Sequence, residues 1–133
     1  MASILIIDDE TDVGESMRRI LERAGFEVHV ETAAESGIAA YQARRSDLVI
    51  TDIVMPGVGG IGVIEAIRRA DGGARIMAIS GGGNFGPANY RPEAVTTSAY
   101  LAAAERTGAD AVLTKPFSKS ELLAAVGRLL PAG

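Results

Sequence analysis

The chain has 133 residues, of which 47% are hydrophobic and 23% are charged. This composition excludes a chain that is disordered throughout, because disorder requires low hydrophobicity and a high net charge. The length is typical of one domain, so we expect a single domain over residues 1–133. The formal net charge is −4 and no run of lysines or arginines is present, which disfavours direct binding to nucleic acid.

Several classes of site are excluded by scarce residue types. The sequence contains no cysteine and a single histidine. Disulfides, thiolate zinc sites and thiol nucleophiles are therefore excluded, and histidine metal clusters are disfavoured. No uncharged apolar stretch reaches the roughly 18 residues that a membrane span needs, and no signal peptide precedes the first charged residues. We expect a cytoplasmic protein that does not bind membranes.

Short apolar runs recur along the chain and predict strands. Each run is rich in aliphatic residues and has the length of a strand that is covered on both faces. The runs span residues 4–7, 26–30, 48–53, 76–79 and 111–113. The segments between and after them place apolar residues at helical spacing, as in the series Val13, Met17, Ile20, Leu21 and the series Leu122, Ala125, Val126, Leu129.

Polar residues and glycines predict where these helices begin and end. A capping box pairs a short polar residue with an acid three residues later. Pairs with this spacing are Ser118 with Glu121, Thr32 with Glu35 and, more weakly, Asp12 with Glu15. Glycine is favoured just after a helix, and Gly25 and Gly108 lie where helix ends are expected.

The alternation of strands and helices predicts the fold class. Strands separated by helices pair in parallel through right-handed crossovers. We therefore predict an α/β fold, a doubly wound five-stranded parallel sheet with helices on both faces. In such a sheet, ligands bind at the carboxyl ends of the strands.

Polar residues gather at the predicted carboxyl ends. Asp8 and Asp9 follow the first strand, Asp52 lies in the third, Ser80 follows the fourth and Lys115 follows the fifth. Carboxylates that lie close together in a partly buried pocket repel one another, so they should hold a proton or a cation. Oxygen ligands without histidine or cysteine favour a hard cation, and we expect Mg²⁺ at this edge of the sheet.

A glycine-rich segment after the fourth strand indicates a different function. Gly81, Gly83 and Gly86 fit the G-x-G-x-x-G pattern that binds the pyrophosphate of a dinucleotide. In that pattern a helix opens directly on the glycines, whereas Pro87 and Pro92 delay any helix here. A nucleotide-binding α/β module is therefore the less favoured alternative.

Three segments match motifs of a known family: ILIIDDE at 4–10, DLVITDIVMPGVGG at 47–60 and GADAVLTKPF at 108–117. Together they resemble the receiver domain of bacterial two-component response regulators, and the resemblance covers nearly the whole chain. It implies a flavodoxin-like receiver fold of the single-domain type. It also implies a phosphorelay signalling protein rather than an enzyme. Such a protein assists its own aspartyl phosphorylation and dephosphorylation.

The resemblance implies a role for each strand-end residue. Asp52 matches the phosphoacceptor, which takes a phosphoryl group from a histidine kinase or a histidine phosphotransfer protein. Asp9 matches the direct Mg²⁺ ligand, Asp8 matches an acid that acts through water, and the backbone carbonyl of Val54 matches a further ligand.

Three more positions match the catalytic and switching part of the pattern. Lys115 matches the lysine that neutralises the phosphoryl charge, and Ser80 matches the hydroxyl that closes onto the new phosphate. Pro116 matches a proline for which the resemblance implies a cis peptide bond after the lysine.

The sequence departs from the family pattern in two places. Val112 stands where an aromatic switch residue is usual, and the loop between the fourth strand and the fourth helix is enlarged, with the sequence GGGNFGPANYRPEAVTT. Three of the six aromatic residues lie in or near this loop, namely Phe85, Tyr90 and Tyr100. They indicate either a contact surface or substitute switch, or local side-chain contacts alone. We hypothesise that phosphorylation of Asp52 reorders this segment and changes affinity for a downstream protein target.

Two other functions are weighed against this resemblance. A pseudo-receiver that is never phosphorylated and acts as a protein adaptor stays open, because the aromatic switch is absent. A phosphatase of the haloacid dehalogenase type is disfavoured, because it would place an acid at Val54. The sequence ends soon after the last predicted helix, so we expect output through a partner protein or through onward phosphotransfer.

Overall fold

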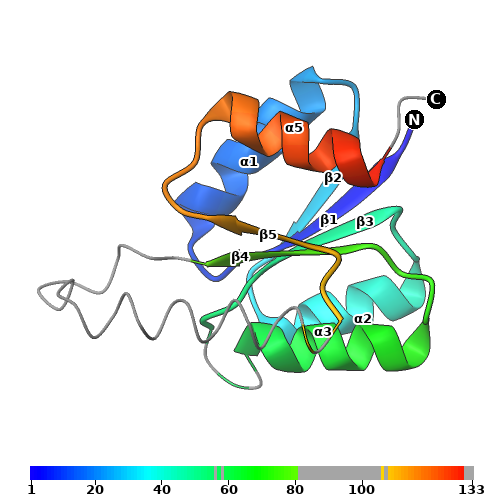
Figure 1. The fold of residues 1–133 in the computed structure, drawn as a ribbon. Coiled ribbons are helices and arrows are strands. Elements are labelled where there is room, and N and C mark those ends of the chain that lie inside the picture. Colours follow the sequence, from blue (N-terminus) through cyan, green and yellow to red (C-terminus); the bar gives the residue numbers. More distant parts are fainter. Residues whose placement is uncertain (56, 58, 81–105, 107, 131–133) are drawn as a thin grey trace, which may run out of the picture.

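The structure is a computed structural model that describes residues 1–55, 57, 59–80, 106 and 108–130. Over these residues the chain forms a five-stranded parallel sheet in the order β2-β1-β3-β4-β5 (Figure 1). The strands are β1 (Ser3–Ile7), β2 (Glu27–Glu31), β3 (Leu48–Asp52), β4 (Ile76–Ser80) and β5 (Ala111–Thr114). The helices are α1 (Thr11–Arg23), α2 (Ala34–Ala43), α3 (Gly59–Ala70) and α5 (Lys119–Leu129). The predicted doubly wound α/β fold is confirmed, and each predicted strand agrees with the observed one to within one residue at either end.

Helices cover both faces of the sheet, which explains why its strands are continuous apolar runs. In Figure 1, α1 and α5 lie on one face and α2 and α3 on the other. Alternate residues of a strand point to opposite faces, and β1 divides accordingly. Leu5 and Ile7 belong to the core under α2 and α3, whereas Ile4 and Ile6 belong to the core under α1 and α5.

The predicted capping box of α5 is confirmed. The backbone N–H of Glu121 donates to Ser118 Oγ at 3.0 Å, and the backbone N–H of Ser118 donates to Glu121 Oε1 at 2.7 Å. Gly25 also follows α1 as predicted. It comes directly after the C-cap residue Ala24 and has a φ of +100°. These two ends were predictable because local bonds and local backbone geometry decide them.

The other two predicted caps are wrong. The N-cap of α2 is Ala33 rather than Thr32, and the N-cap of α1 is Glu10 rather than Asp12; neither makes a side-chain cap. At α1 the reason is the preceding strand end. Asp8 Oδ1 accepts the backbone N–H of Glu10 at 2.9 Å, and this turn starts the helix two residues earlier than the capping spacing indicates.

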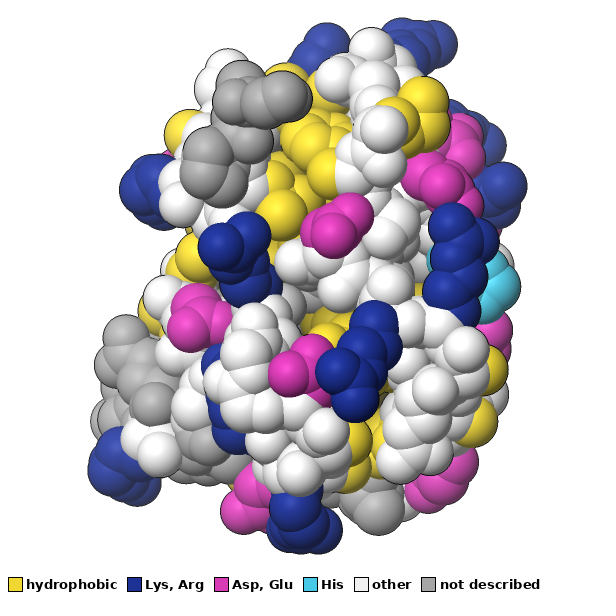
Figure 2. Space-filling model, turned by 90° about the vertical axis from the view of Figure 1, so that its right-hand side faces the viewer, with side chains coloured by type: hydrophobic (Ala, Val, Ile, Leu, Met, Phe, Trp, Pro, Cys, Tyr) yellow, Lys and Arg dark blue, Asp and Glu magenta, His cyan; other side chains and the backbone are white. Residues whose placement is uncertain are grey.

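The two edges of the sheet differ in character. The carboxyl ends of β1, β3, β4 and β5 lie at one edge, where four polar residues are buried: Asp8, Thr51, Asp52 and Ser80. Figure 2 shows the side of the molecule away from these carboxyl ends, where exposed acidic and basic side chains are interspersed. Among the described helices, none combines the length and the apolar composition that crossing a membrane requires.

Candidate functional site

The parallel ladder brings four predicted site residues to one edge of the sheet. Asp8 follows β1, and its backbone N–H donates to Glu31 at the end of β2. Asp52 and Ser80 are the last residues of β3 and β4. The backbone N–H of Lys115, just beyond β5, donates to the carbonyl of Ser80 at 2.8 Å. The strand register therefore aligns these residues, as the sequence predicts.

The ammonium group of Lys115 lies among three carboxylates. Its Nζ is 3.1 Å from Glu10 Oε1, 3.5 Å from Asp8 Oδ2 and 3.7 Å from Asp52 Oδ2. The side chains of Asp8 and Asp52 are 1% and 4% exposed, whereas that of Glu10 is 40% exposed. Among the described residues, one largely buried cation thus faces two buried anions and one anion at the mouth of the pocket.

Two buried carboxylate oxygens accept no hydrogen bond from the described residues. They are Asp8 Oδ2 and Asp52 Oδ1. One oxygen each of Asp8, Glu10 and Asp52 can be chosen so that all lie within 4.8 Å of one another. Buried polar atoms are normally satisfied, and carboxylate oxygens are the ligands that Mg²⁺ takes in proteins. The arrangement therefore fits a divalent cation at this edge.

Burial shifts the protonation of the two buried acids. Burial raises the pKa of Asp52 to about 7; the neighbouring charge of Asp8 adds to the rise, and Lys115 opposes it. Burial also raises the pKa of Asp8, while the backbone N–H of Glu10 and the ammonium of Lys115 oppose that rise. Desolvation is the dominant cause for both acids, because an isolated carboxylate is poorly solvated there.

The pKa of Lys115 is also raised, but neighbouring charges rather than burial cause the rise. Burial alone would lower the pKa of its ammonium, but the charges of Asp52 and Asp8 and the bond to Glu10 outweigh burial and raise that pKa. The lysine therefore stays charged at neutral pH. Over the described residues, one ammonium faces three carboxylates and cannot balance them, which favours a further cation in the pocket.

The structure also locates the remaining predicted positions on the described strands. Ser80 is 3% exposed at the end of β4. The Lys115–Pro116 peptide bond is cis, as the resemblance implies. Val112 lies in β5, partly buried against the core under α2 and α3.

Two predicted metal ligands lie outside the carboxylate cluster. Asp9 is exposed and is not a member of the group formed by Asp8, Glu10 and Asp52, although its charge contributes to the raised pKa of Asp52. Val54 follows β3 and is 37% exposed. Their roles as Mg²⁺ ligands stay predictions.

The predictions on the segment after β4 lie outside the described residues. They concern the enlarged loop, the aromatic residues Phe85, Tyr90 and Tyr100, and the glycines Gly81, Gly83 and Gly86.

Sequence analysis missed Glu10. It directly follows Asp8 and Asp9, and the run of three acids was the available signal. Because Glu10 lies beyond the strand end, a search restricted to strand ends omits it. The turn at Asp8 brings the Glu10 side chain back to Lys115.

Known proteins match both the sequence and the fold. The sequence model of the response regulator receiver domain matches residues 4–127. The Escherichia coli transcriptional regulatory protein CusR is 32% identical, with 98% of this chain and 52% of CusR covered. The response regulator receiver protein Anae109_2439 of Anaeromyxobacter is 34% identical, with coverage of 92% and 46%. The chain thus spans about half the length of the curated relatives it matches.

Solved structures agree with this assignment. The receiver domain of NtrX from Brucella abortus has a TM-score of 0.80 at 29% identity, covering 98% of this chain and 99% of that one. A response regulator receiver domain protein from Clostridium thermocellum also has a TM-score of 0.80, at 26% identity, with coverage of 98% and 94%. With the acidic pocket at the carboxyl edge of its sheet, the chain belongs to the response regulator receiver domain family.

Proposed function

We propose that this receiver domain accepts a phosphoryl group on Asp52. The observation that best supports this role is the state of the Asp52 carboxylate at the end of β3. It is 4% exposed, its Oδ1 accepts no hydrogen bond from the described residues, and its Oδ2 lies 3.7 Å from Lys115 Nζ. The carboxylate thus has one oxygen without a hydrogen bond and the other beside a cation, an arrangement suited to nucleophilic attack on a charged phosphorus centre.

The reaction is a transfer between two nucleophiles. An oxygen of Asp52 attacks phosphorus, an O–P bond forms, and the P–N bond of a donor phosphohistidine breaks. The bonding electron pair leaves with the imidazole nitrogen, which then takes up a proton. Asp52 must be ionised to attack, so its raised pKa places the uncharged, unreactive form within the physiological range.

The residues present fit a Mg²⁺ ion. Asp8 and Asp52 would hold it through the oxygens that accept no hydrogen bond, with Asp9 and the carbonyl of Val54 as further ligands. When bound, Mg²⁺ supplies positive charge that lowers the pKa of these acids and neutralises phosphoryl oxygens. Lys115 supplies a second positive charge from beyond the end of β5, at the same edge of the sheet, where its ammonium already faces Asp52.

Ser80 and Lys115 complete the proposed site. We assign to Lys115 the neutralisation of the transferred group and to Ser80 a hydrogen bond to it. Both residues lie on one side of Asp52: β4 is the sheet neighbour of β3, and the backbone N–H of Lys115 is hydrogen-bonded to Ser80. The donor would be a histidine kinase or a histidine phosphotransfer protein. The output would be altered binding of a downstream protein, or onward phosphotransfer, by a single domain over residues 1–133.

Phosphorylation by a small acyl phosphate with Mg²⁺ tests this proposal. Intact-mass measurement should show one added phosphoryl group on the native chain and none on Asp52→Asn. Asp12→Asn is the matched control, because Asp12 is an exposed acid in the first turn of α1. A folded native chain that gains no phosphoryl group in Mg²⁺ would favour the pseudo-receiver adaptor. A phosphorylated Asp52→Asn chain would assign another acceptor.

A further inference from the structure

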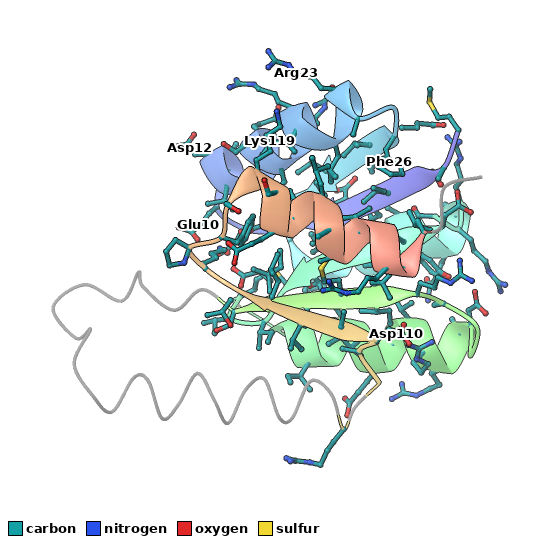
Figure 3. The ribbon with its side chains drawn as sticks, turned by 45° about the horizontal axis from the view of Figure 1, so that its top comes forward. Glu10, Asp12, Arg23, Phe26, Asp110 and Lys119 are labelled. Atoms are coloured by element: carbon teal, nitrogen blue, oxygen red, sulfur yellow. The ribbon has the colours of Figure 1, made fainter. Side chains whose placement is uncertain are left out.

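The strongest contact of the Lys115 ammonium is with Glu10 rather than with Asp52. The Nζ to Oε1 distance of 3.1 Å is a hydrogen bond, whereas Asp8 and Asp52 lie at 3.5 Å and 3.7 Å from the same nitrogen. Figure 3 shows Glu10 at the start of α1, beside the segment that leads from β5 to α5. The lysine is therefore drawn toward the mouth of the pocket.

Glu10 is held in this place by its backbone. It is the N-cap residue of α1, and its carbonyl accepts the backbone N–H of Gly14 at 3.1 Å. Its own N–H donates to Asp8 Oδ1 at 2.9 Å. The hydrogen bond to Asp8 thus fixes the backbone from which the Glu10 side chain extends. A shift of either residue should therefore move the other.

We propose that Glu10 is a positioning residue that holds Lys115 in the unphosphorylated protein and competes with the phosphoryl group for its ammonium. This inference rests on the proposed phosphorylation of Asp52. A phosphoryl group on Asp52 brings new anionic oxygens to the side of Lys115 that faces the pocket. The ammonium must then share or leave the bond to Glu10.

The competition has a definite sign. Glu10 adds a negative charge near the point where an anionic donor must approach, and it engages the cation that would attract that donor. Both effects oppose phosphorylation. Removing the charge of Glu10 while keeping its size should therefore speed phosphorylation and raise the phosphorylated fraction at steady state.

The alternative role of Glu10 predicts the reverse. Its carboxylate belongs to the group formed with Asp8 and Asp52. If Glu10 were needed to hold the metal, its neutralisation would weaken Mg²⁺ binding and slow phosphorylation. The two roles can therefore be separated by the direction of the change.

The test compares the native chain with Glu10→Gln and with Glu22→Gln. Glu22 is also an α1 residue, but it pairs with Arg18 at 3.1 Å on the helix surface. Its substitution removes the same charge away from the pocket. With a small acyl phosphate and saturating Mg²⁺, we expect Glu10→Gln to be phosphorylated about two- to tenfold faster than the native chain. Glu22→Gln should be phosphorylated at the rate of the native chain.

A second readout needs neither metal nor donor. Hydrogen bonds slow proton exchange at a lysine ammonium, so the nitrogen-15 side-chain signal of Lys115 should be observable in the metal-free native chain. It should broaden in Glu10→Leu, which has no side-chain acceptor, and persist in Glu22→Leu. This signal reports the Glu10–Lys115 bond itself, independently of any effect on phosphorylation.

The outcomes distinguish this inference from the proposed function. An unphosphorylated native chain would overturn both. A phosphorylated native chain with an unchanged or slower Glu10→Gln variant would overturn the role of Glu10 and leave Asp52 as the acceptor. An unchanged Lys115 signal in Glu10→Leu would overturn the positioning role even if Glu10→Gln were phosphorylated faster.

Discussion

The carboxylate of Asp52 and the ammonium of Lys115 face each other at 3.7 Å, too far for a hydrogen bond but within reach of strong electrostatic attraction. Asp8 Oδ2 also lies near this ammonium, 3.5 Å from Lys115 Nζ. Burial and, after it, the charge of Asp8 raise the pKa of Asp52 to about 7 despite the neighbouring lysine. The metal-free pocket is electrostatically unfavourable above that pH, and this property can be measured.

The metal-free protein should lose stability as the pH rises toward neutrality. The folded chain keeps the Asp52 proton up to a pKa of about 7, whereas the unfolded chain releases it near 3.8. The resulting stabilisation is complete below the lower value and is lost as the pH rises through the upper one. Asp8 acts in the same direction. Urea unfolding with a chelator present, at several pH values, measures this trend.

Asp52→Asn should remove much of the loss of stability that ionisation of Asp52 causes. At about pH 8 without metal, we expect the variant to exceed the native chain in unfolding free energy by on the order of 1–3 kcal/mol. Near pH 5 the two should converge, because Asp52 is then protonated. Saturating Mg²⁺ should reverse the order, since the native chain binds the ion better. An equal difference at both pH values would contradict a buried, titrating Asp52.

Mg²⁺ binding should release protons. With the pKa of Asp52 at about 7, a cation displaces a proton from a growing share of molecules as the pH falls. We expect affinity to rise about tenfold from pH 6 to pH 8. Calorimetry in two buffers of different ionisation enthalpy counts the released protons. Asp52→Asn serves as the control, and its affinity should depend less on pH.

Lys115→Met should destabilise the metal-free protein. The side chain is 12% exposed, and its removal leaves Asp8 and Asp52 without their compensating cation. At about pH 8 we expect a loss of about 2–4 kcal/mol, within the range for breaking a buried ion pair. The loss should shrink near pH 5, where the acids take up protons. Lys119→Met, at the exposed start of α5, should change stability little.

The predictable parts of this protein were those that local sequence decides. Buried strands are aliphatic because helices cover both sheet faces, so the apolar runs gave the strands directly. The common position of four residues was predictable because parallel strands end at one edge of the sheet; they are Asp8, Asp52, Ser80 and Lys115. The capping box at Ser118 and Glu121 was found because both of its bonds lie within one turn.

The missed features depend on distant contacts or on a local bond that competes with the expected one. Glu10 reaches Lys115 across 105 positions of sequence, and no local pattern marks that pair. The early start of α1 follows from a bond to Asp8, which competes with the cap expected at Asp12. The raised pKa of Asp52 follows from its burial among residues of several strands, which the spacing of acids does not reveal.

Gly60→Ala should destabilise the fold and disturb the site, because α3 begins directly against the end of β3. The backbone N–H of Gly60 donates to the carbonyl of Ile53 at 2.9 Å. A Cβ at this position would overlap the carbonyl oxygen of Asp52 and lie 2.5 Å from Ile53 Cα. Backbone atoms cannot turn aside as a flexible side chain can, so the helix or the Asp52 backbone must shift.

We expect Gly60→Ala to lower the unfolding free energy by about 1–3 kcal/mol and to slow phosphorylation of Asp52. Gly127→Ala is the matched control in α5, where a Cβ would meet nothing within 4 Å. There the same substitution should raise stability by about 0.5–1 kcal/mol, because alanine favours a helix interior over glycine. Thermal unfolding of both variants decides the point: if both gained stability, the close approach of Gly60 to Asp52 would not constrain the site.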